Sequence, residues 1–157
     1  MSEILVAGIG NVFRGDDAFG VEVARRLARR GVGDGVRVVD FGIRGFDLAY
    51  ALSAGPRAAI LVDATSRGGS PGTLYVLEPG DLAEGTTIDT HGMHPLRAIE
   101  LARALGGLPP ILRVVACEAR DVGDDDDVTV GLSSEVEAAV DRAMALVDQL
   151  VGEIDHA

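Results

Sequence analysis

Five short apolar runs, each bounded by a turn or a helix-like segment, dominate this sequence of 157 residues. Each run has the length and the aliphatic content of a buried strand. The runs lie at 3–10, 35–42, 58–65, 71–79 and 111–118. Apolar residues at helical spacing predict helices at 17–30, 46–55 and 94–107, and a last helix that begins at Ser134. This alternation predicts an α/β fold, with a twisted, mostly parallel five-stranded sheet and helices on both faces.

The fourth run is expected to lie antiparallel to the others. The link that joins it to the third run, SRGGSPG, is short and has the turn residues of a hairpin. In the last helix, Ser134 is followed three residues later by Glu137, which is the pattern of a capping box. No linker divides the chain, so we expect a single domain over 1–157, with its core at about 3–150 and a frayed tail at 152–157.

Charge and residue content exclude several classes of function. The net charge is −11, and because phosphate contacts need basic side chains, we expect no nucleic-acid or membrane partner. All 14 basic residues are arginine, and the absence of lysine excludes a P-loop, a Schiff-base enzyme and a Ser-Lys hydrolase. The single cysteine, Cys117, allows neither an internal disulfide nor a cysteine zinc cluster. With no long apolar segment and no basic leader, a cytoplasmic location is expected.

The turn after the first predicted strand, GNVFRGDDAFG, carries two adjacent acidic residues, Asp16 and Asp17. Its glycines resemble the start of a dinucleotide fingerprint, but the third glycine of that motif is replaced by Phe13. Two carboxylates at the start of a helix would also repel a pyrophosphate, so a nucleotide site is excluded. Helix capping accounts for one aspartate, but not for the second or for the glycine-rich turn.

Two further motifs carry no chemistry. Residues 68–72, GGSPG, fit the letters of a nucleophile elbow, but they lead into a strand, whereas an elbow joins a strand to a helix. The acidic run at 121–127 lacks the spaced ligands and the glutamate of an EF-hand loop. We interpret the first as a turn and the second as a solvated loop.

Three side chains are expected to converge at one edge of the sheet. Asp17 follows the first strand, Asp63 ends the third, and His91 lies in the loop after the fourth. The carboxyl ends of parallel strands meet at one crevice, and an antiparallel fourth strand would return the chain to it. Two carboxylates and an imidazole suit a first-row divalent metal.

Taken in order, the motifs of this chain resemble those of the hydrogenase maturation endopeptidases, which trim the large subunit of nickel-iron hydrogenases. The resemblance extends from about residue 3 to residue 150. Its most specific part is G-x-G-N-x-x-x-x-D-[DE]-x-x-G. The stretches that carry it are GIGNVFRGDDAFGVEVARRL, DFGIRGFDL, ILVDA, PGTLYVLEP, DTHGM and GLSSEVEAAV.

The resemblance implies a function and a set of residues. The family removes a C-terminal peptide from the large-subunit precursor after nickel insertion, and the precursor's nickel is the recognition element. Carried over, the metal-binding residues are Asp17, Asp63 and His91, and the two carboxylates are also the candidate catalytic residues. No tightly bound cofactor is required, although a divalent metal can occupy the site. A glycine-rich segment that includes Gly42, Arg44 and Gly45 is expected to contact the substrate.

On this interpretation the acidic turn faces the cation of a substrate, with Asp16 capping the helix and Asp17 pointing at the metal. The sequence departs from the family where the first ligand, often Glu, is the shorter Asp17, and where Ala18 replaces a common Gly. A second histidine, His94, is either a fourth ligand or a bystander at a helix start. We favour the bystander, because Pro95 already marks a first helical turn.

Peptide hydrolysis by this chain would use an activated water. Cys117 lies in an apolar strand, where a thiol is inert, and the motifs contain no serine triad. A carboxylate acting as a base, or the substrate's metal, would activate the water. Two alternatives remain open: a metal-sensing or chaperone-like binding module without hydrolysis, and a hydrolase with a different substrate.

Overall fold

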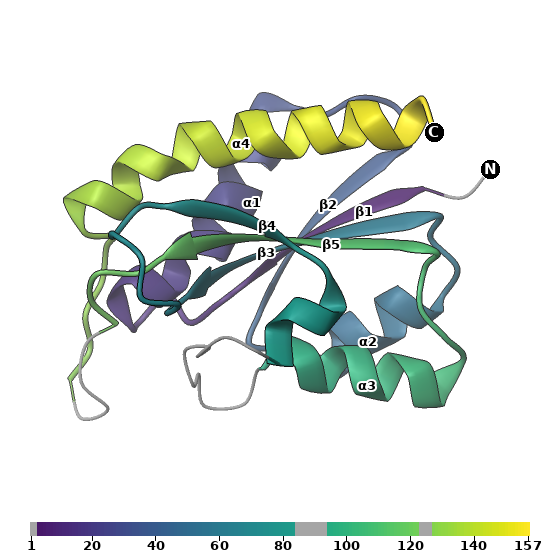
Figure 1. The fold of residues 1–157 in the computed structure, drawn as a ribbon, viewed down its shortest axis with the longest axis horizontal. Coiled ribbons are helices and arrows are strands. Elements are labelled where there is room, and N and C mark those ends of the chain that lie inside the picture. The colour runs from purple at the N-terminus through teal and green to yellow at the C-terminus, as the bar shows by residue number, and fades with distance from the viewer. Residues whose placement is uncertain (1–2, 84–93, 123–126) are drawn as a thin grey trace.

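A five-stranded sheet runs through the centre of the protein. The computed structural model describes residues 3–83, 94–122 and 127–157. The strands are β1 (Ile4–Ile9), β2 (Val36–Gly42), β3 (Ala58–Thr65), β4 (Leu74–Leu77) and β5 (Ile111–Glu118), arranged in the order β2-β1-β3-β5-β4 (Figure 1). β4 is antiparallel to β5, and the other neighbouring strands are parallel. The predicted mostly parallel sheet with a reversed fourth strand is therefore confirmed.

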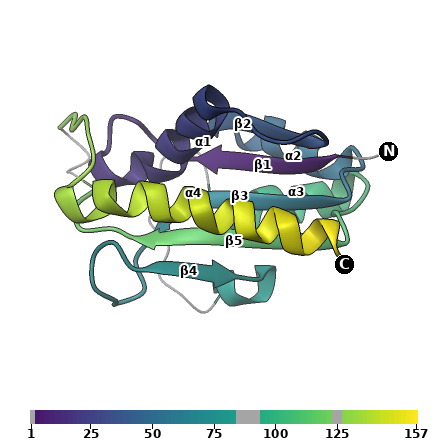
Figure 2. The same cartoon turned by 90° about the horizontal axis from the view of Figure 1, so that it is seen from above.

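Helices cover both faces of the sheet, as predicted (Figures 1 and 2). α1 (Phe19–Arg30) and α4 (Ser134–Asp155) pack on one face, and α2 (Gly45–Ser53) and α3 (Pro95–Leu105) pack on the other. Two short 3-10 helices, η1 (Gly15–Ala18) and η2 (Pro79–Ala83), complete the elements. In the described part of the chain, no helix is both long enough and apolar enough to cross a membrane.

Alternation along the strands divides the core between the two faces. In β1, Ile4 and Val6 pack toward α1 and α4, whereas Leu5 and Ala7 pack toward α2 and α3. Every residue of β1 and β3 is buried, as expected for parallel strands covered on both sides. With 4% aromatic residues in the chain, this core is mostly aliphatic.

Two predictions about α4 are wrong. The helix has Ser133 as its N-cap, and no capping box forms, because the Ser134 hydroxyl bonds to Glu135 and Glu137 pairs with Arg26 of α1. The predicted frayed tail is instead helical as far as Asp155. The apolar spacing of the helix continues to Ile154, which is buried in the core, so this last turn is held by packing.

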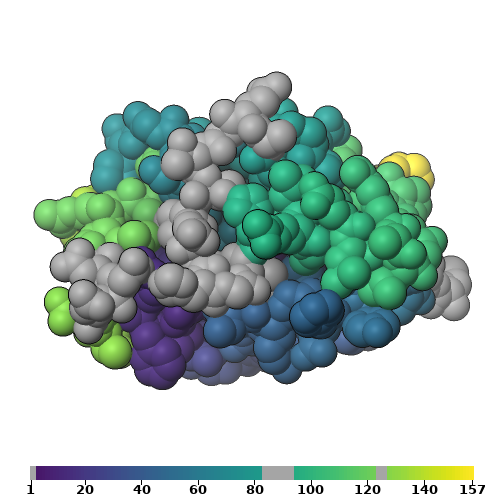
Figure 3. Space-filling model, turned by 90° about the horizontal axis from the view of Figure 1, so that it is seen from below, coloured from purple at the N-terminus to yellow at the C-terminus, as the bar shows by residue number. Residues whose placement is uncertain are grey.

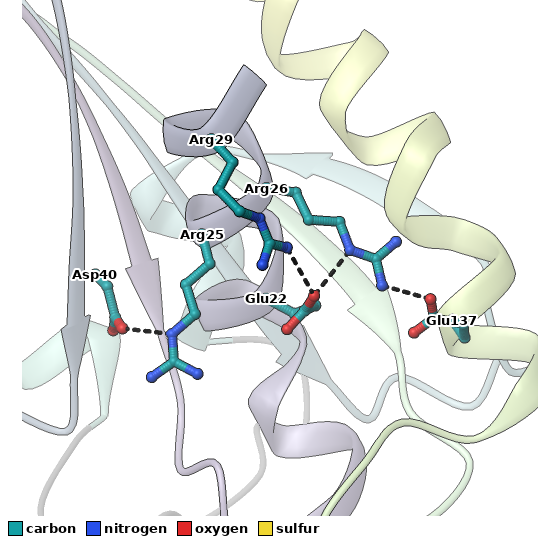
Figure 4. Close-up of polar contacts among 6 residues, drawn as sticks. All are labelled: Glu22, Arg25, Arg26, Arg29, Asp40 and Glu137. Carbon is teal, nitrogen blue, oxygen red and sulfur yellow. Dashed lines mark hydrogen bonds and ion pairs between the residues drawn. The ribbon is translucent and has the colours of Figure 1, made fainter. Parts of the chain in front are cut away.

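Ion pairs on the outer surface of α1 connect it to its neighbours (Figure 4). Arg26 contacts Glu22 at 2.8 Å and also reaches Glu137 of α4. Arg25 pairs with Asp40 of β2 at 3.1 Å. These side chains are partly or largely exposed, so each pair adds less than about 1 kcal/mol to stability.

The start of α1 presses directly against the ends of two strands. A Cβ atom built on Gly20 would lie 1.9 Å from the Val62 carbonyl oxygen of β3 and 2.5 Å from that of Ile9. Real Cβ atoms do not approach so closely, so any side chain at position 20 would push α1 away from the sheet.

We predict that Gly20→Ala lowers the free energy of unfolding by about 3 kcal/mol or more, because backbone oxygens cannot yield as a side chain would. Gly152→Ala is the matched control: position 152 lies within α4 and has no atom within 4 Å of the added methyl. There the higher helix propensity of alanine should stabilise the fold by up to about 1 kcal/mol. Urea unfolding of both variants measures the difference. Equal stabilities would show that the contact at Gly20 is not tight.

Candidate active site

The candidate site lies where the strand order reverses. β2, which follows β1 in sequence, lies on one side of β1, and β3 lies on the other side. The strands that follow β3 are then added away from β1. The β1–β3 ladder ends at the Gly8–Val62 pair, and Asp63 is the next residue of β3. In open α/β sheets this crevice, beyond the carboxyl ends of the strands, is the usual place for a ligand.

Glycine contacts bring Asp17 to the same place. A Cβ atom on Gly10 would lie 1.9 Å from the Asp17 carbonyl oxygen, and Gly10 has a φ of +146°. The turn after β1 therefore folds back until η1, which contains Asp17, touches the strand end. Together with the contact at Gly20, this explains the glycine-rich pattern that helix capping left unexplained.

Asp17 is buried and incompletely hydrogen bonded. Its side chain has no exposed surface, and its Oδ2 accepts a hydrogen bond from the Asn11 N–H at 3.0 Å. Its Oδ1 has no hydrogen-bond partner among the described residues. Burial raises the pKa of Asp17 to about 6, although the Asn11 N–H and the charge of Arg14 act in the opposite direction.

Asp63 shares this environment. It is 8% exposed, and its Oδ1 accepts a hydrogen bond from the N–H of Ala64 at 2.9 Å. Burial, with the negative charge of Asp17 as the next cause, raises the pKa of Asp63 well above its usual range. The two carboxyl groups therefore repel each other when both are ionised. A cation or a shared proton would relieve that repulsion.

The predicted capping role of Asp16 is wrong. The N-cap of α1 is Ala18, and no side chain caps that helix. Asp16 is fully buried, and its carboxylate accepts hydrogen bonds from the N–H groups of Arg120, Asp121 and Ser133 and from the Ser133 hydroxyl. Its neighbour Asp17 has one oxygen without a hydrogen-bond partner among the described residues, so the two buried aspartates differ in their hydrogen bonding.

Sequence reasoning missed a further buried carboxylate, Glu118, at the end of β5. It is 3% exposed and accepts hydrogen bonds from the N–H groups of Arg67 and Gly69 and from the Tyr75 hydroxyl. A sequence signal for Glu118 was present, since this acidic residue follows a run of apolar residues just as Asp63 does. Its partners, however, lie in the turn before β4 and, for Tyr75, in β4 itself, and these contacts cannot be inferred from strand patterns.

The histidine of the predicted ligand set, His91, lies outside the described residues. Within residues 3–83, 94–122 and 127–157, no group of three or more His, Cys, Asp or Glu side chains is placed to hold a metal. The complete set of Asp17, Asp63 and His91 therefore stays a prediction. His94 is the N-cap of α3, and its Nδ1 accepts a hydrogen bond from the Leu96 N–H at 3.2 Å, as expected for a residue at a helix start.

A groove of about 340 Å³ borders the turn that carries Asp17. Two of the predicted substrate-binding residues, Gly42 and Arg44, line it, and Gly45 begins α2 beside it. The groove residues are Gly10, Asn11, Val12, Phe13, Arg25, Asp40, Phe41, Gly42, Ile43 and Arg44. Asn11, which also donates to Asp17, connects the groove to the acidic pair.

The groove belongs to a face on which distant parts of the chain meet. In Figure 3 the purple segment after β1 lies between the blue β2–α2 segment and the yellow-green chain that precedes α4. Arg44 is anchored there by hydrogen bonds from its guanidinium to the carbonyl oxygens of Phe41 and Asp40. The Arg25–Asp40 pair shown in Figure 4 forms part of the groove wall.

Cys117 cannot act as a nucleophile in this site. Its side chain is fully buried in the core, and burial raises the pKa of the thiol to about 12. A thiolate is therefore not formed at neutral pH. This agrees with its predicted role as an inert core residue.

The fold and the acidic crevice define a doubly wound α/β protein with a paired-carboxylate site. The sequence profile of the hydrogenase maturation proteases matches residues 21–149. A Methanocaldococcus jannaschii protein named for that family is 31% identical over 155 residues, which cover 97% of this chain and 96% of that protein. This chain belongs to the hydrogenase maturation protease family, as its motifs predicted, and its class is that of a peptidase.

Solved structures agree with this assignment. The hydrogenase maturating endopeptidase HybD from Escherichia coli superposes with a TM-score of 0.82 at 27% identity, over 96% of this chain and 93% of that one. The nickel-iron hydrogenase maturation protease HycI from Thermococcus kodakarensis superposes with a TM-score of 0.66, also at 27% identity, over 98% and 92% of the two chains.

The raised pKa of Asp17 predicts a pH-dependent effect of Asp17→Asn. Since folding favours the protonated carboxyl, the protein has its full stability below the ordinary pKa of 3.8 and loses part of it as the pH rises through about 6. That difference corresponds to up to about 3 kcal/mol. Asp17→Asn should therefore stabilise the fold at pH 7.5 and have little effect at pH 4.

Urea unfolding at the two pH values measures this effect. Asp34→Asn, at an exposed position, is the control and should show no comparable dependence. Loss of stability in Asp17→Asn at pH 7.5 would mean that the carboxylate is well solvated or paired in the native protein.

Proposed function

We propose that this protein is an endopeptidase that removes a C-terminal peptide from the large-subunit precursor of a nickel-iron hydrogenase once nickel has been inserted. Membership in the family supports hydrolysis of a peptide bond. The observation that carries the site is the buried pair of Asp17 and Asp63 at the switch point. One Asp17 oxygen has no hydrogen-bond partner among residues 3–83, 94–122 and 127–157. The proposed location of this reaction is the cytoplasm.

Recognition of the precursor would use its nickel as a cargo ion. The Asp17 and Asp63 carboxylates, together with His91, supply oxygen and nitrogen ligands of the kind that divalent first-row metals accept. The Oδ1 of Asp17 has no hydrogen-bond partner in the part of the chain that the structure describes, and a cation there would interact with this buried oxygen. The protein needs no tightly bound cofactor of its own for this role.

Hydrolysis would be of the aspartic type, with water as the nucleophile. A carboxylate removes a proton from the water as the water oxygen attacks the scissile carbonyl carbon. The resulting carboxylic acid then returns this proton to the amide nitrogen as the C–N bond breaks. Asp17 is the first candidate for the base, because in the metal-free protein burial raises its pKa to about 6, close to neutral pH. The buried thiol of Cys117 leaves the water without a competing nucleophile on β5.

The groove would hold the polypeptide next to the cleavage point. It presents apolar side chains, including Phe13 at 56% exposure and Ile43 at 43%, beside the anchored guanidinium of Arg44. An apolar groove beside a few fixed polar groups suits an extended peptide segment. Gly42 and Gly45 flank Ile43 and Arg44 and let the chain turn from β2 into α2.

Cleavage is tested by incubating the purified protein with a nickel-loaded precursor and weighing the products by mass spectrometry. We expect the loss of one defined C-terminal peptide. We expect no cleavage with nickel-free precursor, and Asp17→Asn or Asp63→Asn should lower the rate at least about a hundredfold. Nickel-dependent binding without cleavage would instead identify a binding module, and cleavage of the nickel-free precursor would refute nickel recognition.

Ile43→Ser tests the groove. We expect the KM for the precursor to rise about fivefold or more, because an apolar contact of this size is worth about 1 kcal/mol or more, while kcat changes little. Val76→Ser on β4 is the matched control, since Val76 is 45% exposed and lies outside the groove. Equal KM values for the two variants would place the substrate elsewhere.

A further inference from the structure

Asp16 forms a junction between two parts of the chain that are far apart in sequence. Its Oδ2 accepts hydrogen bonds from the N–H groups of Arg120 (2.8 Å) and Asp121 (2.9 Å) and from the Ser133 hydroxyl (2.8 Å). Its Oδ1 accepts from the Ser133 N–H at 2.7 Å. The donors lie 104 to 117 residues further along the chain. One buried carboxylate thus accepts hydrogen bonds from both ends of the segment between β5 and α4.

Backbone hydrogen bonds extend this junction. The Asp16 N–H donates to the Asp121 carbonyl at 2.8 Å, and the Gly15 N–H donates to the Thr129 carbonyl at 2.8 Å. The Thr129 N–H donates to the Phe13 carbonyl at 2.9 Å. A Cβ atom on Gly15 would lie 2.7 Å from the Asp121 oxygen, so the two segments are in close contact. Residues 13–16 are therefore held in place by hydrogen bonds to residues 121 and 129, which lie outside their own turn.

The position of Asp17 depends on this hold. η1 has only four residues, and no side chain caps its start at Arg14. Within the turn, Asp17 is held by its own N–H, which donates to the Arg14 carbonyl at 3.1 Å, and by the Asn11 N–H on its Oδ2. So short a helix has little stability of its own. The four hydrogen bonds to the side chain of the preceding residue, Asp16, therefore add to the backbone bonds that orient η1.

We infer that Asp16 is a positioning residue: by binding residues 120, 121 and 133 it fixes the turn after β1 and holds the Asp17 carboxylate in the crevice beside Asp63. This inference rests on the proposed function for its catalytic consequence, but the positioning itself is a property of the free protein. Asp16 does not touch the substrate in this role.

The chemistry of the junction makes Asp16→Asn a sharp test. Four donors converge on two carboxylate oxygens, and an asparagine amide offers one oxygen and one N–H₂ group. In either orientation the N–H₂ group faces at least one other donor. The variant keeps the size of the side chain and weakens the junction by placing an N–H₂ group against at least one of these donors. Ser133→Ala is the milder companion, since it removes one hydroxyl and leaves the carboxylate.

The test measures kcat and KM on nickel-loaded precursor. Asp16→Asn should lower kcat about tenfold to a hundredfold, because a displaced catalytic group costs that much, with KM within about twofold of wild type. Ser133→Ala should lower kcat less, and the double variant should be no worse than Asp16→Asn, because both changes break one junction. Glu118→Gln is the control, since Glu118 is also a buried, hydrogen-bonded carboxylate but holds the turn before β4.

A fall in kcat of the same size in Glu118→Gln would show a general loss of structure and overturn the inference. A second readout needs no substrate: the ¹³C signal of the Asp17 carboxyl should shift in Asp16→Asn and stay in place in Glu118→Gln. An unchanged Asp17 signal in Asp16→Asn overturns the inference. If the wild type cleaves nothing while the Asp17 signal shifts as expected, the proposed function fails and the positioning stands.

Discussion

The contact between the backbone of α1 and the strand ends determines the geometry of this protein's site. With no side chain at Gly20, the first turn of α1 reaches the carbonyl oxygens of Val62 and Ile9, where a Cβ atom would lie 1.9 and 2.5 Å away. Gly10 allows the same closeness between the strand end and the Asp17 backbone. Asp17 therefore lies against β3 beside Asp63, under the cover of α1. A larger residue at either glycine would open the crevice to water.

Among the described residues, four buried carboxylates lie at this edge of the sheet, and their hydrogen bonds divide them into two kinds. Asp16 and Glu118 are surrounded by donors and hold loops in place. Asp17 and Asp63 each accept a hydrogen bond from one backbone N–H of the described chain, and they repel one another when both are ionised. Burial of a carboxylate without enough hydrogen-bond donors destabilises the folded protein. Carboxylates of this kind are therefore common at functional sites. The difference in hydrogen bonding separates the two carboxylates that hold loops from the pair that forms the candidate site.

Much of the fold and part of the site could be predicted from the sequence. The apolar runs predicted the sheet, and the SRGGSPG link predicted the reversed β4, because both depend on local pattern. Asp63 could be placed at the candidate site, because an acidic residue directly after a run of apolar strand residues lies near the carboxyl edge of the sheet. Asp17 could not be told from Asp16 by this reasoning, since the two are adjacent and both suit a helix start.

The rest depended on partners that are remote in sequence. Asp16 is matched by donors more than 100 residues away, and Glu118 by a turn about 50 residues before it. The Ser134–Glu137 capping box failed for a related reason, because Glu137 pairs with Arg26, 111 residues earlier. Local propensity predicts a cap, but tertiary contacts with a stronger partner replace it.

The ionisation of the acidic pair is most directly measured by ¹³C NMR titration of the aspartate carboxyl carbons in the metal-free protein. Asp17 should titrate near pH 6, where burial places its pKa, and Asp63 should titrate well above the usual aspartate range. Removing one charge, in Asp17→Asn, should lower the pKa of Asp63. Titration of both groups near pH 4, each unaffected by the other, would contradict a buried, interacting pair and with it the candidate active site.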